Sequence, residues 1–99
     1  MRVAVGCLAM AVLLPAAASA DETLEKAGKT LAQEQCSSCH AVANSGGSDA
    51  APSFASVANK RDDDYLRAFL AKPHGAMPAV DLSNNEVEAI IAYIESLKK

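Results

Sequence analysis

Two cysteines and a histidine stand within the five residues Cys36-Ser37-Ser38-Cys39-His40, and this segment constrains the fold more than any other part of the chain. The thiols are separated by two residues, and an imidazole follows the second thiol directly. A fold of this chain has to bring all three side chains to one site, in this order. Few kinds of site use a pair of thiols with an adjoining imidazole.

The spacing predicts the attachment site of a c-type haem. The thiols of Cys36 and Cys39 can each add across one vinyl group of the porphyrin, which gives two thioether bonds. His40 then lies under the iron and can donate its Nε2 atom as the proximal ligand. We therefore expect one covalently bound haem c.

Two other kinds of site use paired cysteines. Cys36 and Cys39 could instead form a redox disulfide. Such motifs usually stand at the start of a helix in a thioredoxin-like α/β fold, but this sequence shows no pattern of strands. A structural zinc ion needs four ligands, but only His40 and His74 could join the two thiols, without a second paired motif. Haem attachment is favoured, and both alternatives stay open.

The first twenty residues have the pattern of a secretory signal peptide. Arg2 gives a positive start, residues 3–14 are almost wholly apolar, and Ala18-Ser19-Ala20 supplies the small residues that a signal peptidase requires. We expect cleavage after Ala20, which leaves residues 21–99 as a single domain. The alternative is a retained membrane anchor, but the apolar run is shorter than the roughly 18–20 residues that span a bilayer.

The mature chain would have 79 residues and only four aromatic side chains. Chains of this size often need a cofactor or a covalent staple, because they bury a limited fraction of their surface. A porphyrin would supply core material that the sequence lacks.

Removal of the signal peptide leaves 8 basic and 12 acidic residues, a formal charge of −4. This charge argues against a nucleic-acid partner, because no basic patch is available to neutralise phosphates. An acidic surface suits partners with positive patches. It can equally serve solubility alone.

Helical periodicity predicts an all-α fold with three main helices. The first runs from about Glu22 to Gln35, has its small and apolar positions on one face, and leads directly into the cysteine motif. Thr23 is its expected N-cap. Residues 43–53 are rich in Asn, Ser, Gly and Pro, which predicts a loop.

The other two helices have clear boundary signals. One is expected over about 63–71, because Asp62 can cap it and Pro73 disfavours its continuation. The last helix follows a capping box made by Ser83 and Glu86, after which the apolar residues as far as Leu97 share one face.

Met77 is the expected sixth ligand of the iron. It is the only methionine of the mature chain and lies in the short segment 74–78 between two predicted helices. A His/Met pair raises the reduction potential, because thioether sulfur favours Fe(II). Met77 can instead simply pack in the core. His74 competes with it as a ligand, but these neighbours cannot occupy the same position.

On these residues the sequence resembles a small class I (monohaem) cytochrome c over nearly all of the mature chain. The shared features are a glycine in the first helix, the cysteine motif, a later proline, a Met-Pro segment and an aromatic residue in the last helix. Here they are Gly28, Cys36 to His40, Pro52, Met77-Pro78 and Tyr93. The resemblance implies an all-α class I cytochrome c fold around the haem, in which the N- and C-terminal helices cross closely at the glycine.

The resemblance also gives Pro52 a role. Its carbonyl would accept a hydrogen bond from Nδ1 of His40 and so orient the imidazole. The sequence departs from the family where Ala32 replaces a frequent aromatic residue, and where no tryptophan is present to hold a haem propionate. The candidates to take the place of that tryptophan are Lys60, Arg61 and Tyr65, and the sequence does not choose among them.

These features predict a soluble periplasmic one-electron carrier rather than an enzyme. With both axial positions filled by His40 and Met77, the iron would have no open site for substrate, and no residue is expected to act as a general acid, base or nucleophile. The resemblance implies that the partners are redox proteins, which would dock weakly and briefly at the exposed haem edge. Nothing in the sequence demands a dimer, so we expect a monomer that is not inserted in a membrane.

Two alternatives remain. A haem enzyme or gas-binding protein would have Met77 absent from the iron or easily displaced, which leaves an open or labile sixth position. A dedicated subunit or docking partner of one dehydrogenase or oxidase would have its function defined by the complex.

Overall fold

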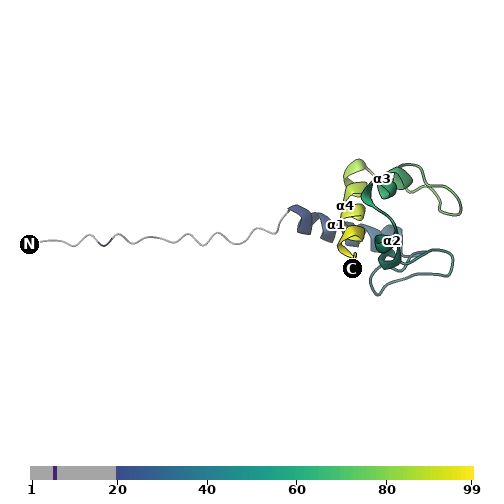
Figure 1. The fold of residues 1–99 in the computed structure, drawn as a ribbon, viewed down its shortest axis with the longest axis horizontal. Coiled ribbons are helices and arrows are strands. Elements are labelled where there is room, and N and C mark those ends of the chain that lie inside the picture. The colour runs from purple at the N-terminus through teal and green to yellow at the C-terminus, as the bar shows by residue number, and fades with distance from the viewer. Residues whose placement is uncertain (1–5, 7–19) are drawn as a thin grey trace, which may run out of the picture.

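The computed structural model describes Gly6 and residues 20–99, and this part of the chain contains four helices (Figure 1). They are α1 (Ala20–Gln35), α2 (Phe54–Lys60), α3 (Asp63–Ala71) and α4 (Asn84–Ser96). These residues contain no strand, only an isolated bridge between Val42 and Ser45. The predicted all-α fold is confirmed.

Helix α4 organises the fold, because α1, α2 and α3 all pack against it. Its start is the predicted one: the Ser83 side chain accepts a hydrogen bond from the backbone of Glu86, and the Glu86 side chain accepts one from the backbone of Ser83. This reciprocal pair satisfies two backbone N–H groups that the helix itself leaves free. The capping box therefore fixes where the central helix begins.

The first and last helices cross at Gly28. A Cβ atom on this residue would lie 1.8 Å from the carbonyl oxygen of Ala89 and 3.0 Å from Cβ of Tyr93. Backbone meets backbone here, which only glycine permits. The expected crossing of the terminal helices at this glycine is confirmed, and it places the end of α1, where the cysteine motif begins, beside α4.

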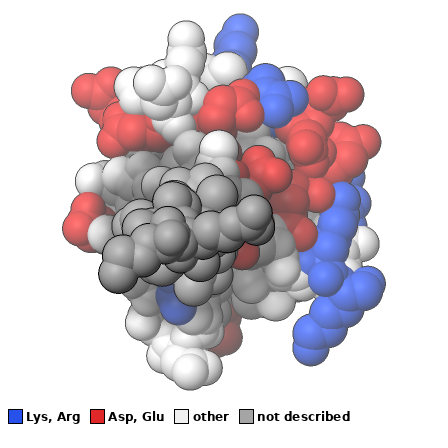
Figure 2. Space-filling model, turned by 90° about the vertical axis from the view of Figure 1, so that its left-hand side faces the viewer, with Lys and Arg blue, Asp and Glu red and all other residues white. Residues whose placement is uncertain are grey.

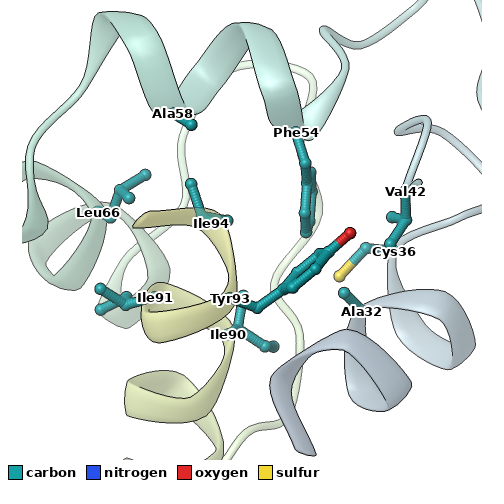
Figure 3. Close-up of a cluster of buried hydrophobic side chains, with 10 residues drawn as sticks. All are labelled: Ala32, Cys36, Val42, Phe54, Ala58, Leu66, Ile90, Ile91, Tyr93 and Ile94. Carbon is teal, nitrogen blue, oxygen red and sulfur yellow. The ribbon is translucent and has the colours of Figure 1, made fainter. Parts of the chain in front are cut away.

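A core of buried apolar side chains fills the space between the helices (Figure 3). From α4 it takes Ile90, Ile91, Tyr93 and Ile94, and the other helices, the motif and the loop after it contribute the rest. The rest are Ala32, Cys36, Val42, Phe54, Ala58 and Leu66. The buried Cys36 thus joins the cysteine motif to the core.

Helix α2 was not predicted from the sequence. It is only seven residues long, and its N-cap Ser53 accepts a hydrogen bond from the backbone N–H of Ser56. So short a helix has almost no stability of its own. It forms because Phe54 and Ala58 are buried in the core. The sequence Pro52-Ser53 was the available start signal.

The start of α1 differs from the prediction. Thr23 lies inside the helix, which begins at Ala20, so its expected role as the N-cap is wrong. Asp21 and Glu22 occupy the first turn. Negative charge is favourable there because the helix dipole leaves its N-terminus partly positive, and this extends the helix beyond the expected cap.

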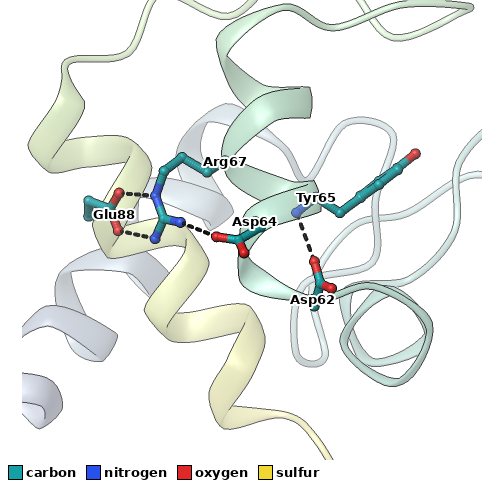
Figure 4. A network of polar contacts seen from close by, with 5 residues as sticks. All are labelled: Asp62, Asp64, Tyr65, Arg67 and Glu88. Carbon is teal, nitrogen blue, oxygen red and sulfur yellow. Dashed lines mark hydrogen bonds and ion pairs between the residues drawn. The ribbon is translucent and has the colours of Figure 1, made fainter.

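Polar contacts join α3 to α4 on the surface (Figure 4). The guanidinium of Arg67 donates two hydrogen bonds to the Glu88 carboxylate, at 2.5 and 2.9 Å, and a third to Asp64 at 3.2 Å. Asp62 caps α3 as predicted by accepting from the backbone N–H of Tyr65 at 2.8 Å. The bidentate pair of Arg67 and Glu88 holds α3 onto the central helix α4. Helix α3 forms one wall of the site described below.

Charged side chains are distributed unevenly over the surface. On the face shown in Figure 2, acidic side chains lie on several sides, whereas most basic ones gather toward one edge. The expected signal peptide, residues 1–20, lies outside the described residues except for Gly6 and Ala20. Among the described residues, no helix is long and apolar enough to cross a membrane.

Candidate functional site

The cysteine motif continues directly from the end of α1. The backbone N–H of Cys36 donates to the carbonyl of Ala32 at 2.9 Å, and the N–H groups of Cys39 and His40 both donate to the carbonyl of Cys36. The chain therefore turns tightly, which brings the three side chains of the motif together. Both cysteines are free thiols; Cys36 is buried and Cys39 is exposed. Burial raises the pKa of the Cys36 thiol.

The ring of His40 is held by two neighbours. Its Nδ1 atom lies 2.6 Å from the carbonyl oxygen of Pro52, and the ring of Phe54 lies 5.3 Å away, centroid to centroid, at a tilt of 55°. A carbonyl oxygen can only accept a hydrogen bond, so Nδ1 carries the proton. The lone pair of the neutral imidazole is then on Nε2, the atom that a metal would use.

A cavity of about 360 Å³ opens beside the motif. Its lining includes Cys36, Cys39 and His40 from the motif, Pro52 from the following loop, and Met77 from the segment between α3 and α4. The five residues expected at the site thus meet at one cavity, although Met77 follows Cys36 by about forty positions. His74 is not part of the lining; its ring instead packs against Phe69 at 4.6 Å.

The lining suits a haem group. Apart from the motif it is mainly apolar, with contributions from Phe54, Val57, Leu66, Leu70 and Ile94. Its volume is in the range of pockets that bury a cofactor or a ligand of similar size. The donor set also fits, because two thiols can form thioethers while imidazole nitrogen and thioether sulfur are iron ligands of c-type haem. The described residues hold no cluster of three or more His, Cys, Asp or Glu side chains placed to bind a metal ion by themselves.

The sequence analysis did not assign a definite role to three residues that line the cavity. Phe54, which packs against His40 and Tyr93, was noticed only as one of four aromatics. Arg61 lies over the ring of Tyr65, 4.3 Å from its centroid, and both residues line the cavity. Lys60, the third candidate for the propionate site, does not line it. Phe54 and Arg61 stand at the two ends of α2, the helix that the sequence did not reveal, whereas Tyr65 lies in α3.

Arg61 is the only charged side chain among the described residues that line the cavity. Its position over an aromatic face, within the usual distance of a cation–π contact, restricts where the guanidinium can lie. The cavity therefore has one cationic point on an otherwise uncharged wall. A ligand with an apolar body and a carboxylate at its edge would match this arrangement.

Comparison with known proteins agrees with this site. The chain matches the family described as "Cytochrome C oxidase, cbb3-type, subunit III" over residues 23–94. Cytochrome c-552 of Bradyrhizobium diazoefficiens is 47% identical over 75 residues, which cover 72% of this chain and 72% of that protein. Cytochrome c oxidase subunit 2 of Alkalihalophilus pseudofirmus is 34% identical over 92 residues, which cover 78% of this chain and 27% of that longer subunit. No solved structure matches this chain significantly.

The family match covers well over half of the chain, including the whole cysteine motif and Met77. Family and structure agree on an all-α fold with paired thiols at a mainly apolar cavity. The chain therefore belongs to the c-type cytochromes, as a small monohaem cytochrome c that binds its haem covalently.

Proposed function

We propose that this protein is a soluble periplasmic one-electron carrier whose haem iron takes His40 and Met77 as axial ligands. One observation supports this more than any other: Cys36, Cys39, His40 and Met77 all line the same cavity. Two thioether bonds would hold the porphyrin at the motif. The imidazole and the thioether would then occupy the two remaining positions on the iron.

The hydrogen bond from His40 to Pro52 prepares the proximal side. Because Nδ1 donates to the Pro52 carbonyl, the ring presents Nε2 as its unprotonated nitrogen. Such a bond also makes the imidazole a stronger electron donor to the metal. The thioether of Met77 has the opposite preference, since soft sulfur stabilises Fe(II). The reduction potential would reflect the balance of the two ligands.

When bound, the haem supplies reversible one-electron chemistry at its iron. The residues of the chain supply the surroundings: Leu66, Phe69, Leu70 and Ile94 give the cavity apolar walls that exclude water. An environment of low polarity raises the cost of the extra positive charge of the oxidised iron. These walls and the Met77 ligand therefore act in the same direction on the potential.

Arg61 would pair with the haem propionates. Within the described part of the chain it is the one cation on the cavity wall, and its cation–π contact with Tyr65 limits the positions it can adopt. A guanidinium can bind a carboxylate through two parallel hydrogen bonds. Arg61 and Tyr65 would thus take the place of the tryptophan that other members of the family use.

Export and docking complete the proposal. The pattern of residues 1–20 supports cleavage by a signal peptidase and a mature domain of residues 21–99. The exposed Cys39 lies on the cavity wall, so the haem edge at this thioether would face solvent and redox partners. Contacts there would be brief, as in other electron-transfer encounters, and the protein would act as a monomer.

A second candidate is electron delivery within, or directly to, a terminal oxidase. Two comparisons favour it, because the matching family is described as an oxidase subunit and a similar sequence forms part of an oxidase subunit 2. The protein would transfer one electron at a time in either role, as a free carrier or as part of an oxidase. Copurification of the mature protein with a membrane-bound oxidase would support this candidate, whereas a freely released periplasmic protein supports the first.

Spectra and redox titration of the purified holoprotein test the ligand assignment. We expect a low-spin spectrum, a weak sulfur-to-iron band in the oxidised form and a single one-electron transition. Met77→Ala should remove the sulfur band, lower the potential and open the site to carbon monoxide. His74→Ala is the matched control, since His74 packs outside the cavity lining, and it should leave all three properties unchanged.

The opposite results identify the alternatives. A high-spin spectrum, or ready binding of carbon monoxide by the unmodified protein at neutral pH, would favour a haem enzyme or gas-binding protein. An unchanged spectrum in Met77→Ala would remove Met77 from the ligand set. Mass spectrometry of the periplasmic fraction tests the remaining points, because the mature protein should begin at Asp21 and carry one haem on the peptide that contains Cys36 and Cys39.

A further inference from the structure

The side chain of Ser48 connects the cysteine motif to the loop that follows it. Its hydroxyl donates to the carbonyl of Cys39 at 3.2 Å and accepts from the backbone N–H of Ala50 at 3.1 Å. The backbone N–H of Ser48 donates to the same Cys39 carbonyl at 3.0 Å. One hydroxyl thus joins two stretches of backbone, at Cys39 and at Ala50. The sequence analysis had predicted for Ser48 only a position in a loop.

Both stretches lead directly to the proximal histidine and its partner. Cys39 precedes His40, and Ala50 lies two residues before Pro52, whose carbonyl accepts from Nδ1 of His40 at 2.6 Å. The chain and these bonds form a closed ring. A hydrogen bond joins His40 to Pro52, and the backbone leads from Pro52 back to Ala50. The Ser48 hydroxyl then connects Ala50 to Cys39, the residue before His40. Two side chains close this ring, those of His40 and Ser48.

Two glycines let the loop approach the motif closely enough for this contact. Gly46 has a φ of +68°, and a Cβ atom there would lie 2.1 Å from the carbonyl oxygen of Ser37. Gly47 has a φ of +103° and donates its N–H to the same carbonyl at 2.8 Å. Both conformations are easy for glycine and costly for other residues. They direct the chain back over the motif, so that Ser48 reaches Cys39.

We infer that Ser48 is a positioning residue for His40: its hydroxyl holds the Pro52 carbonyl against the imidazole and so sets how strongly this ring donates to the iron. Without the hydroxyl, the Ala50 N–H loses its acceptor, and only one backbone bond joins Ser48 to Cys39. The Pro52 carbonyl then moves more freely, and the bond from Nδ1 of His40 opens more often. This inference rests on the proposed function, in which His40 is an iron ligand.

The test compares three variants of the holoprotein. Ser48→Ala removes the hydroxyl, Ser48→Thr keeps it, and Ser45→Ala is the matched control, because the hydrogen bonds of Ser45 to Val42 in the same loop are made by its backbone. NMR of the reduced protein gives the exchange rate of the Nδ1 proton of His40. Redox titration gives the potential, and the haem methyl shifts of the oxidised protein report the orientation of the imidazole.

We expect Ser48→Ala, which removes both hydrogen bonds of the hydroxyl, to exchange this proton about fivefold faster, a factor of the size that the net contribution of neutral hydrogen bonds gives. Its potential should rise, because a weaker bond at Nδ1 makes the imidazole a poorer donor to Fe(III). Its haem methyl shifts should change as well. Ser48→Thr and Ser45→Ala should match the unmodified protein in all three measurements.

The inference is overturned if Ser48→Ala matches Ser45→Ala in exchange rate and potential, or if Ser48→Thr behaves like Ser48→Ala. Failure of the proposed function gives a different result. In that case, the reduced, unmodified protein would lack the strongly ring-current-shifted resonances of an imidazole bound over the haem. That outcome is visible before any variant is compared.

Discussion

The crossing of α1 and α4 and the loops around the haem cavity are held together in different ways. At the crossing, backbone meets backbone at Gly28, and Ile90 and Ile94 nearby are almost fully buried. Around the cavity, His40 and Met77 are only half-buried, Pro52 is exposed, and hydrogen bonds hold the loop to the motif. Close packing thus provides the stability, whereas the loops, which are held by hydrogen bonds, carry the groups that would tune the iron.

Replacement of Gly28 by alanine tests the crossing and should have the largest effect. Alanine in place of glycine normally stabilises an exposed helix position by about 1 kcal/mol. Here the added carbon would meet the Ala89 carbonyl at 1.8 Å, so the helices must separate. We expect a loss of about 3 kcal/mol in the free energy of unfolding, measured by urea denaturation of the holoprotein.

The control for this variant is Lys29→Ala, at the next position of α1, which is exposed. It should change the stability by no more than about 0.5 kcal/mol. A gain in stability from Gly28→Ala would show that helix propensity outweighs packing at this position. The crossing would then be looser than the structure has it.

The same substitution in a loop should cost much less. Gly75, two residues before Met77, has a φ of +71°, and a Cβ atom there would have no neighbour within 4 Å. Gly75→Ala therefore brings backbone strain without a clash, and we expect a loss of about 1 kcal/mol by the same measurement. The sulfur-to-iron band expected from the proposed Met77 ligand should persist. A loss as large as that of Gly28→Ala would contradict the contrast between the two regions.

The sequence predicted the elements whose signals are local. The capping box of Ser83 and Glu86 placed the start of α4, and Asp62 with Pro73 gave the observed bounds of α3. Helix α2 has no comparable signal, because its seven residues are helical only through burial of Phe54 and Ala58. The start of α1 was misplaced because a plausible cap, Thr23, lies within a stretch that continues as helix.

The residues of the site, too, fall into those that the sequence predicted and those that it did not. The cysteine motif and Met77 could be chosen from residue type and spacing, and the structure brings them to one cavity. The contact of Phe54 with His40 and the double hydrogen bond of Ser48 depend on how the loop folds back. That path follows from two glycines with positive φ. Residue type alone does not reveal it.

Tyr93 stands where the two regions meet, and its hydroxyl should be dispensable. The side chain is 5% exposed, and its oxygen makes no well-formed hydrogen bond within the described part of the chain. Burial raises the pKa of this phenol, and the nearby backbone of Ala43 offsets the effect only in part. Tyr93→Phe removes a poorly paired polar atom from the core, so we expect a gain in stability of about 1 kcal/mol.

Urea denaturation of the holoprotein measures this gain, with Lys29→Ala again as the control at an exposed position of α1. A loss of stability in Tyr93→Phe would mean that the hydroxyl bonds the Ala43 backbone strongly. The α4 helix would then hold the loop as well as the crossing, and the two regions would be less independent than proposed.

The ion pair of Arg67 and Glu88 should have the smallest effect, although it joins the cavity wall α3 to α4 (Figure 4). The hydrogen bond from Arg67 lowers the pKa of Glu88 below its ordinary value. The folded state therefore binds a proton less readily than the unfolded state, and the pair stabilises the fold above that ordinary value. Both side chains are more than 40% exposed, so Glu88→Gln should cost only about 0.5 kcal/mol at pH 7.

The dependence on pH and salt shows whether charge is the cause. The difference between Glu88→Gln and the unmodified protein should begin to shrink near the ordinary pKa of a glutamate. It should disappear only below the lowered pKa of Glu88 in the folded state, where the native carboxylate also becomes neutral. It should shrink in 1 M salt, which screens exposed charges. Glu34→Gln, at an exposed position of α1, is the control. A difference that persists in acid and in salt would mean that Glu88 acts through packing of its side-chain stem. Close packing, as at the crossing of α1 and α4, would then hold α3 in place, rather than surface charge.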